Sequence, residues 1–302
     1  MKRKEKMKIG IDIGGSHIAV GIVDGNNIIN KSETEINKNN VQDIEEFILT
    51  YIVNTISKLK QNEEIELIGI ATPGNPKNGN ISTMVNLGVD EYNIKEKIEQ
   101  YYKVPITVRN DAKCAALAEK RYGSLKDYED AVFLCLGTGI GSAVFLNNQL
   151  LVPKRNTGFE IGHMEIEKQW EKCNCGKLGC FEAYCSIKRF REKIKNILKI
   201  PEEIQGKDFL DILHNNISNM EVQQVIIMYI QDLLVGISNI IDIFEPEAIS
   251  IGGGFAYYKD ILYNKLLEEF YNRKYVFNKN SLPEIKLASL GNDAGIIGAV
   301  IN

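Results

Sequence analysis

One local pattern occurs twice in this chain and limits the folds that are open to it. Residues 7–29 read as a buried strand that runs into glycines, followed by two more strands around an Asp24-Gly25 turn. Residues 131–151 repeat the order of strand, glycine turn, strand, Asn-rich turn and strand. Two copies of one β-meander unit predict two similar domains.

The remaining periodicity predicts an α/β arrangement. A length of 302 residues suggests about two domains, and a hydrophobic content of 44% can form a sizeable core. Asn110 and Asp111 stand where a strand at 106–110 gives way to an Ala-rich helix, and residues 73–90 are expected to be irregular. Further helices are predicted at 41–60, 186–198, 221–244 and from about Asp293, with strands at 65–71 and 247–253.

Composition excludes two classes of partner. Thirty-six basic and forty acidic residues give a net charge of -4, so there is no global positive field for nucleic acid or an anionic membrane. Apolar runs such as 225–230 fall short of the ~20 residues of a membrane span, and residues 1–10 do not form a signal peptide. We therefore expect a cytoplasmic protein whose six cysteines are reduced.

Three glycine-rich segments follow predicted strands. Glycines let the backbone approach a ligand closely, and successive N–H groups can hold phosphate oxygens. The alternative is a tight hairpin without a ligand, and neither the P-loop nor the dinucleotide-binding pattern is present. The candidate residues are Gly14, Gly15, Ser16, Gly137, Thr138, Gly139, Gly141, Gly252, Gly253 and Gly254.

The segment from residue 163 to residue 180 gathers possible metal ligands. His163, Cys173, Cys175 and Cys180 supply one nitrogen and three thiolates, which is enough for tetrahedral zinc. Four protein ligands leave no open coordination position, so the ion would be structural. The alternative is a group of reduced surface thiols, which would be prone to oxidation. The other cysteines, Cys114, Cys135 and Cys185, lie in apolar contexts that suggest core packing.

Two carboxylates have alternative interpretations. Asp111 could cap the helix that it precedes, or it could accept a proton from a substrate hydroxyl. Asp12 could make structural hydrogen bonds or associate with magnesium or phosphate. The local sequence alone leaves both choices open.

Seven segments together resemble the ROK family of bacterial sugar kinases and sugar-responsive repressors: DIGGSHIAVGIVD, GIATPGNP, NDAKCAALAE, LGTGIG, GFEIGH, CNCGKLGCFE and ISIGGG. The resemblance spans nearly the whole chain. It implies an actin-like, hexokinase-like (ribonuclease H-like) two-domain α/β fold with an interdomain active-site cleft. The expected domains are residues 1–115, joined by a C-terminal helix at about 290–302, and a larger α/β domain at 116–289 that carries the zinc-binding loop.

The resemblance also implies roles for individual residues. Asp111 would be the catalytic base, and the sugar would be bound by Gly74, Asn86, Asn110, Asp111, Glu160, His163 and Glu182. DIGGS and LGTGIG would hold the ATP phosphates, with Asp12 beside them, and Gly252, Gly253 and Gly254 would line the adenosine pocket. Ser16-His17 stands where the family usually has Thr-Lys. Zinc bound to one nitrogen of His163 would direct its other N–H toward a sugar hydroxyl.

These roles predict an ATP-dependent kinase that phosphorylates a hexose hydroxyl, with glucose as the expected sugar. The alternatives are a fructokinase, an N-acetylhexosamine kinase or a non-catalytic sugar-sensing protein. A repressor is disfavoured, because the first phosphate motif begins only about ten residues from Met1. The expected cofactors are ATP, Mg²⁺ and structural Zn²⁺, and the expected assembly is a homodimer that binds neither nucleic acid nor membrane.

Overall fold

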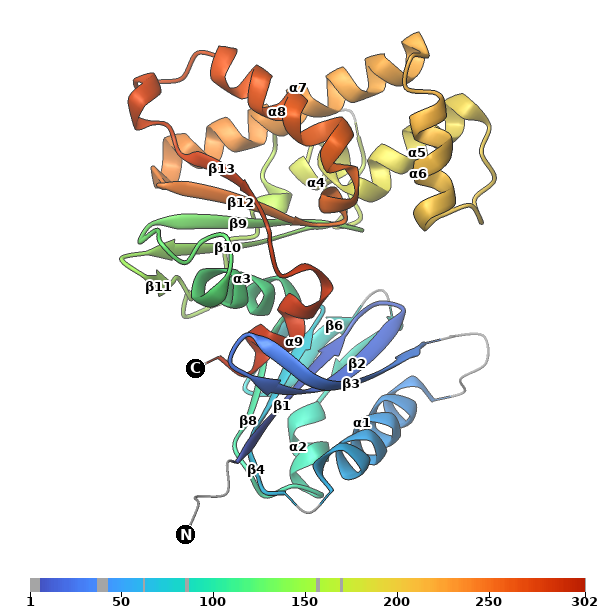
Figure 1. Ribbon diagram of the computed structural model, residues 1–302, viewed down its shortest axis with the longest axis vertical. Coiled ribbons are helices and arrows are strands. Elements are labelled where there is room, and N and C mark those ends of the chain that lie inside the picture. The colour runs from blue at the N-terminus through green and yellow to red at the C-terminus, as the bar shows by residue number, and fades with distance from the viewer. Residues whose placement is uncertain are drawn as a thin grey trace. The chain divides into compact units, whose positions relative to one another are not determined.

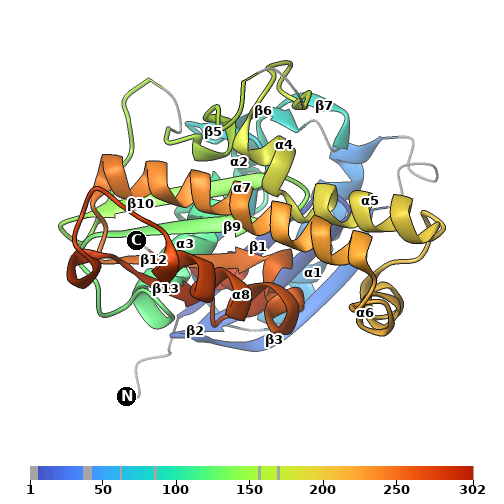
Figure 2. The same ribbon diagram turned by 90° about the horizontal axis from the view of Figure 1, so that it is seen from above.

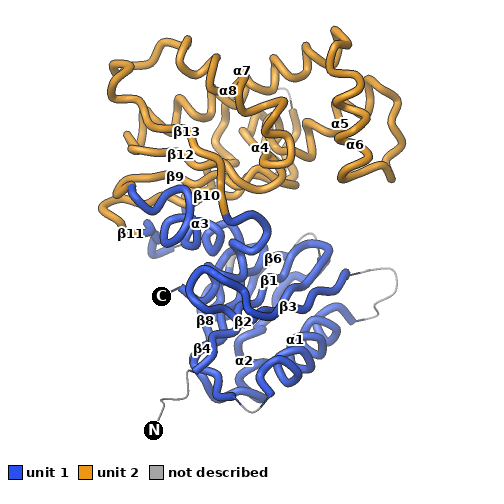
Figure 3. Tube along the Cα trace, in the orientation of Figure 1, with its two compact units in different colours: residues 1–127, 150–158, 290–302 blue, residues 128–149, 159–289 orange. Residues whose placement is uncertain are grey.

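The computed structural model describes residues 6–36, 43–61, 63–84, 87–155, 158–168 and 171–301. The chain divides into two compact units, which Figure 3 colours separately. Unit 1 comprises residues 1–127, 150–158 and 290–302, and unit 2 comprises residues 128–149 and 159–289. The predicted boundary near residue 115 falls within helix α3 (Asp111–Tyr122), which belongs to unit 1 over its whole length.

Unit 1 is built on a five-stranded mixed sheet of order β3-β2-β1-β4-β8. The predicted meander is confirmed, because β2 pairs antiparallel with both β1 and β3, whereas β4 is parallel to both β1 and β8. The strands are β1 (Met7–Ile13), β2 (His17–Asp24), β3 (Asn27–Glu35), β4 (Ile65–Thr72) and β8 (Ile106–Asn110).

Helices cover both faces of this sheet, as Figure 1 shows. Helices α1 (Ile44–Lys60) and α2 (Ile94–Glu99) bury apolar side chains on one face, and α3 and α9 (Ala294–Ala299) cover the other. The backbone of helix α9 packs directly against the backbone of the strands. A Cβ at Gly10 would collide with the carbonyl of Ile296, and one at Gly69 would collide with the carbonyl of Ala299. Glycine at these two positions lets α9 pack closely on β1 and β4.

A second, small sheet in unit 1 corrects the expectation that residues 73–90 are irregular. Strands β5 (Asn75–Lys77), β6 (Asn80–Met84) and β7 (Val89–Tyr92) form an antiparallel sheet. Asn78 and Gly79 join β5 to β6 with φ values of 54° and 87°, as in the tight hairpin turn that favours Asn-Gly. The sequence signal was therefore a hairpin turn rather than a loop.

Unit 2 repeats the sheet order of unit 1. Its strands are β9 (Ala131–Leu136), β10 (Ile140–Leu146), β11 (Gln149–Leu150), β12 (Ala248–Gly253) and β13 (Glu284–Leu287), in the order β11-β10-β9-β12-β13. The predicted duplication of the unit is thus confirmed. The helices gather on one face of the sheet (Figures 1 and 2): α4 (Phe181–Cys185), α5 (Ile187–Leu198), α6 (Gly206–Asn215), α7 (Met220–Phe244) and α8 (Lys259–Asn272).

The length and composition of helix α7 contradict the expectation that every apolar segment is too short to span a membrane. Within the described residues it is the one helix long and apolar enough, with a mean hydropathy of 1.6 over 18 residues. Half of that window is buried in the structure, and α7 packs on α4, α5 and α8. The expectation rested on unbroken apolar runs, whereas the helix interleaves apolar residues with a few polar ones such as Gln231 and Asp232.

Candidate functional site

Predicted sugar-binding residues of unit 1 lie at the carboxyl end of its parallel strands, together with Asp12, which was predicted to associate with magnesium or phosphate. Strands β1, β4 and β8 are parallel, so their carboxyl ends lie side by side at the same end of the sheet. Asp12 lies near the end of β1, Gly74 follows β4, and Asn110 ends β8. The register pairs Asp12 with Ala71 and Thr72 with Asn110, which brings the three strand ends level.

Asn110, not Asp111, is the N-cap of helix α3. Its Oδ1 accepts the backbone N–H of Lys113 at 3.3 Å, and its Nδ2 donates to the carbonyl of Gly74 at 3.2 Å. Asp111 is the first residue of the helix, where its Oδ1 accepts the N–H of Ala112 at 2.7 Å. The capping function that competed for Asp111 is thus performed by its neighbour.

Two carboxylates in this region have raised pKa values. Burial and the nearby charge of Asp111 raise the pKa of Asp12 from 3.8 to about 7, while Lys31 opposes the shift and Glu33 adds to it. Burial also raises the pKa of Asp111, against the hydrogen bonds that its carboxylate accepts and the charge of Lys113. A raised pKa suits a group that must accept a proton near neutral pH.

The first glycine turn, after β1, is closed by a hydrogen bond from the N–H of Gly14 to the carbonyl of His17 at 2.8 Å. A Cβ at Gly14 would lie 2.8 Å from Cε1 of the His17 ring, so the imidazole occupies the space beside this glycine. Gly15 is half-buried, and Ser16 is exposed at the turn. The exposed Ser16 hydroxyl is the group here best placed to meet an anion from solvent.

The second glycine turn, between β9 and β10, presents Thr138 to solvent. The N–H of Gly137 donates to the carbonyl of Gly139 at 2.9 Å, and the carbonyl of Gly137 accepts the N–H of Lys188 at the start of α5 at 3.1 Å. Gly141 belongs to β10, where it pairs with Cys135. The conformation of the turn is therefore fixed by a hydrogen bond within its own backbone and by one from the start of α5.

Glu182 joins this turn to the metal-binding loop. Its Oε2 accepts the N–H of Ile140 at 2.9 Å and fills the space that a Cβ at Gly139 would need. Its Oε1 lies 3.4 Å from Sγ of Cys173. One carboxylate therefore contacts both the predicted phosphate turn and the predicted zinc site.

The third glycine segment ends β12. Gly252 is buried, because a Cβ there would meet Ala288 and the Phe133 ring at 2.9 and 3.0 Å. Gly253 is exposed and has a φ of 70°, which favours glycine, and Gly254 packs near Ile187. Packing within unit 2 thus accounts for Gly252, and backbone conformation accounts for Gly253.

The four predicted metal ligands come together. Their ligand atoms all lie within 4.8 Å of one another, with His163 Nδ1 at 3.6 Å from Cys173 Sγ and Cys175 Sγ at 3.7 Å from Cys180 Sγ. Thiolate and imidazole ligands of a tetrahedral zinc lie about 3.6–3.8 Å apart. The residues therefore fit a closed zinc site, although other thiophilic ions share this chemistry.

Glycines shape the loop that carries the cysteines. Gly176 and Gly179 have φ values of 90° and 78°. The N–H of Gly176 donates to the carbonyl of Cys173 at 3.0 Å, and the N–H of Cys173 donates to the carbonyl of Lys177 at 2.9 Å. These tight turns bring the three thiols to one point, and Cys173 and Cys180 are buried while Cys175 is exposed.

A short 3₁₀ helix, η2 (Ile161–His163), positions the remaining polar residues. Glu160 precedes it, and its carbonyl accepts the N–H of His163 at 2.9 Å. Since Nδ1 of His163 faces the thiols, Nε2 lies on the opposite side of the ring. Glu160 is exposed.

The other cysteines mostly follow expectation. Cys114 and Cys185 are fully buried, and burial raises the pKa of both thiols. Cys135 is only half-buried in β9, which differs from the expected core packing, because its sulfur lies at the glycine-lined end of β12 near Gly253. Asn86, a predicted sugar contact, lies outside the described residues.

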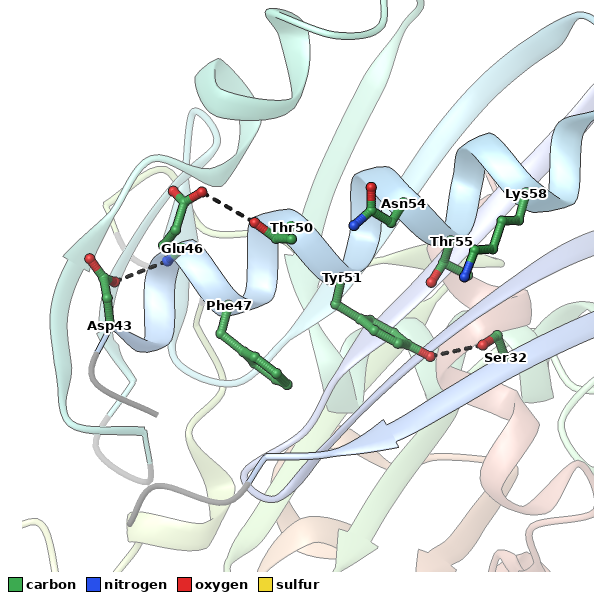
Figure 4. A pocket seen from close by; sticks show the side chains of 9 residues that line it. All are labelled: Ser32, Asp43, Glu46, Phe47, Thr50, Tyr51, Asn54, Thr55 and Lys58. Carbon is green, nitrogen blue, oxygen red and sulfur yellow. Dashed lines mark hydrogen bonds between the residues drawn. The ribbon is translucent and has the colours of Figure 1, made fainter. Parts of the chain in front are cut away.

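An open groove of about 500 Å³ runs along α1 and β3 in unit 1, and Figure 4 shows its side chains. None of its lining residues is a predicted site residue. Tyr51 and Ser32 share a hydrogen bond of 3.0 Å across it. The groove is lined by Ser32, Asp43, Glu46, Phe47, Thr50, Tyr51, Asn54, Thr55 and Lys58.

Sequence reasoning missed Lys113 and Ser142. Lys113 is buried on α3, and its Nζ donates to the carbonyl of Gly158 at 3.0 Å. Ser142 is buried in β10, and its hydroxyl donates to the carbonyl of Phe159. A lysine within the Ala-rich stretch DAKCAALAE was the one available signal for Lys113, since its charge interrupts an otherwise apolar face.

Comparison with known proteins gives relatives over nearly the full length. The chain is 30% identical over 308 residues to a glucokinase of Thermotoga maritima, which covers 96% of this chain and 95% of the glucokinase. It is 28% identical over 300 residues to a xylose repressor of Bacillus spizizenii, covering 98% of this chain and 76% of the repressor.

A ROK hexokinase of Thermus thermophilus superposes on the structure with a TM-score of 0.81 at 25% identity, covering 97% of this chain and 96% of the hexokinase. The predicted actin-like, hexokinase-like α/β fold is therefore confirmed. A family model described as the ROK family matches residues 8–301. With the repeated sheet, the glycine turns and the Cys₃His cluster in place, the chain belongs to the ROK family.

Proposed function

We propose that this protein is a cytosolic ATP-dependent sugar kinase that converts glucose to glucose 6-phosphate. The arrangement around Asp111 is the observation that carries the proposal. Asn110 caps helix α3 and binds the Gly74 carbonyl, so Asp111 begins the helix at the sheet edge with a raised pKa. A carboxylate in that position is suited to accept a proton from a sugar hydroxyl as the hydroxyl attacks a phosphoryl group.

In this proposal the residues near the metal cluster orient the sugar. Zinc, when bound by His163 and the three cysteines, fixes the imidazole ring. Nε2 of His163 then donates to one sugar hydroxyl, while Glu160 and Glu182 accept from others. Since Glu182 already accepts the Ile140 N–H through Oε2, its Oε1 is the oxygen assigned to the sugar.

The glycine turns are assigned to ATP. Exposed Ser16 and Thr138 offer hydroxyl donors to phosphate oxygens, and exposed Gly253 offers a surface without a side chain to the adenosine. Mg²⁺, when bound with ATP, would neutralise charge on the transferred phosphoryl group, and Asp12 is the carboxylate assigned to its hydration shell. The similarity to a glucokinase of Thermotoga maritima supports these assignments.

A coupled ADP-release assay tests the proposal directly. Purified protein is given ATP, Mg²⁺ and one of glucose, fructose, mannose, N-acetylglucosamine or N-acetylmannosamine. We expect sugar-dependent ADP release that is fastest with glucose. Faster release with fructose or an N-acetylhexosamine would reassign the substrate within the same reaction, and replacing ATP with polyphosphate would test the donor. The expected homodimer is checked by light scattering on the same sample.

A non-catalytic sugar sensor is the second candidate. Two observations favour it: the similarity to a xylose repressor, and a histidine rather than a lysine at position 17 beside the first glycine turn. This candidate predicts sugar binding by calorimetry without ADP release for any sugar in the panel. Xylose is added to that calorimetry because the related repressor is named for it.

A further inference from the structure

Lys113 is an unusual residue for the interior of a helix packed against a sheet. Its side chain is only 8% exposed, and lysine is rarely buried to this degree unless its ammonium group is paired. The Nζ donates to the carbonyl of Gly158 at 3.0 Å, within unit 1. The Lys113 side chain thus connects α3 to a carbonyl 45 residues further along the chain than Lys113 itself.

The peptide that Lys113 contacts has a restrained conformation. Gly158 and Phe159 have φ values of 75° and 54°, and the left-handed region is unfavourable for phenylalanine. A Cβ at Gly158 would collide with the Pro153 ring. Such a conformation persists only where surrounding contacts fix it.

Successive carbonyls of this peptide are held by different side chains. Lys113 holds the carbonyl of Gly158, and the buried Ser142 hydroxyl holds that of Phe159. The Phe159 ring packs edge-on against Phe244, with 5.8 Å between ring centroids. Glu160 follows directly, so the direction in which it leaves the turn depends on both anchors.

Lys113 also acts on Asp111. Burial raises the pKa of Asp111, and the charge of Lys113, two residues along α3, opposes this shift together with hydrogen bonds from Ala112 and Asn110. Asp12, on β1, repels Asp111 in turn, and Lys31 and Glu33 on β3 act on Asp12. The Lys113 ammonium is therefore part of the charge balance around the proposed base.

We infer that Lys113 is a positioning residue that fixes the turn leading to Glu160 and supplies a buried positive charge to the helix end that carries Asp111. The inference rests on the proposed kinase function, because Asp111 and Glu160 are its proposed base and sugar ligand. Lys113 is not assigned a contact with the substrate. Its effect is exerted through the two residues that it holds.

Three substitutions separate the anchor from the charge. Lys113→Met removes both, Lys113→Gln keeps a donor without the charge, and Lys113→Arg keeps the charge. In Lys113→Met we expect kcat/KM for the sugar to fall about 10–100-fold, the effect of a displaced binding group. The acidic limb of the pH profile of kcat/KM should move to higher pH by roughly half to one unit in the Met and Gln variants and stay in place in the Arg variant.

Lys195 provides a matched control. It is a second buried lysine, 6% exposed on α5, and its Nζ donates to the carbonyl of Glu202 at 2.6 Å. Lys195→Met should lower the melting temperature without moving the sugar KM or the acidic limb. If Lys113→Met behaves in the same way, Lys113 is only a buried structural lysine and the inference is overturned.

A titration keeps this test independent of activity. Protein labelled with ¹³C at the aspartate carboxyls gives the titration midpoint of Asp111, assigned by its loss in Asp111→Asn. The midpoint should be higher in Lys113→Met and Lys113→Gln than in wild type. If wild type phosphorylates no sugar but the midpoint moves, the kinase proposal fails and the charge effect of Lys113 stands. If Lys113→Met has the wild-type Asp111 midpoint and the wild-type sugar affinity by calorimetry, the inference is overturned. If Lys113→Met does not fold, Lys113→Gln is compared with Lys113→Arg in the same two measurements.

Discussion

Glu182 and Gly139 share one small volume: Oε2 of Glu182 lies where a Cβ on residue 139 would project, and it accepts the neighbouring Ile140 N–H at 2.9 Å. Gly139 is assigned to the ATP phosphates, whereas Glu182 is assigned to the sugar. The absence of a side chain at Gly139 therefore leaves the space that the Glu182 carboxylate occupies. A ligand that moves either group must also disturb the other.

Gly139→Ala is expected to weaken the binding of sugar as well as nucleotide. The added methyl group displaces the Glu182 carboxylate, and losing a hydrogen bond to a charged group costs about 1.5–3 kcal/mol, or roughly 10–100-fold in glucose affinity. Gly137→Ala is the matched control, because nothing lies within 4 Å of a Cβ there. It should affect only the nucleotide. Calorimetry with glucose and a non-hydrolysable ATP analogue checks both, and unchanged glucose affinity in Gly139→Ala would disprove the link.

Asp111→Asn should reduce turnover by roughly 10²–10⁴-fold, the usual contribution of a positioned general base. Because Asn110 is the N-cap, the fold should tolerate the change and glucose affinity should stay close to wild type. Steady-state ADP release and glucose calorimetry measure the two quantities separately. Turnover equal to that of wild type would exclude Asp111 as the base, and Asn110→Ala, which removes the cap, should instead lower the melting temperature.

Purified protein is expected to contain about one zinc per chain, the number that one Cys₃His cluster implies. Cys175→Ser should lose the metal, since a neutral hydroxyl replaces one thiolate. Sugar affinity should fall as His163 and Glu182 lose their fixed positions, while nucleotide affinity survives. Cys114→Ala, in unit 1, should retain the zinc. Active wild-type protein without metal by elemental analysis would refute the role of the cluster.

Asp12→Asn should raise the free energy of unfolding at pH 8. With a pKa of about 7 in the folded state against 3.8 ordinarily, Asp12 keeps its proton more readily when folded. Wild-type stability therefore falls as pH rises through this interval and stays lower above it. At about 1.4 kcal/mol per pKa unit, the gain from removing the charge is at most about 4–5 kcal/mol, and it should vanish near pH 4.

Urea unfolding at pH 4, 6 and 8, with magnesium chelated, measures this dependence. The exposed Asp24 provides the control, since Asp24→Asn should leave the pH dependence of stability unchanged. A gain at pH 4 as large as that at pH 8 would point to packing rather than charge at position 12.

The sequence was most informative where local patterns decide structure. Alternating apolar residues around glycine turns predicted the two meanders, and the change from strand to helix at Asn110 was located correctly. The Cys₃His spacing predicted a cluster that the fold does assemble. In each case the residues lie close along the chain, so their geometry follows from turns and periodicity.

What the sequence did not predict depends on contacts between distant segments. The burial of Gly252 was not predicted, because it results from contact with Phe133 on β9 and with Ala288, which follows β13. Lys113 lies in the predicted Ala-rich helix, and only the fold brings the Gly158 carbonyl to it. Whether Asn110 or Asp111 caps the helix depends on a difference of one residue in where the helix begins, and composition cannot resolve this difference.

The close packing of α9 on the first sheet has a consequence for synthesis of the protein. One face of the β1–β4 sheet is covered by Ala294, Ile296, Ile297 and Val300, which the ribosome adds only after all of unit 2. The 162 residues from 128 to 289, which separate the two larger parts of unit 1, take roughly 8–32 s to translate at about 5–20 residues per second. During that interval the nascent N-terminal sheet has an uncovered apolar face, and unit 2 can complete its own core first. Termination of translation just before residue 294 would therefore leave unit 1, and not unit 2, without part of its core.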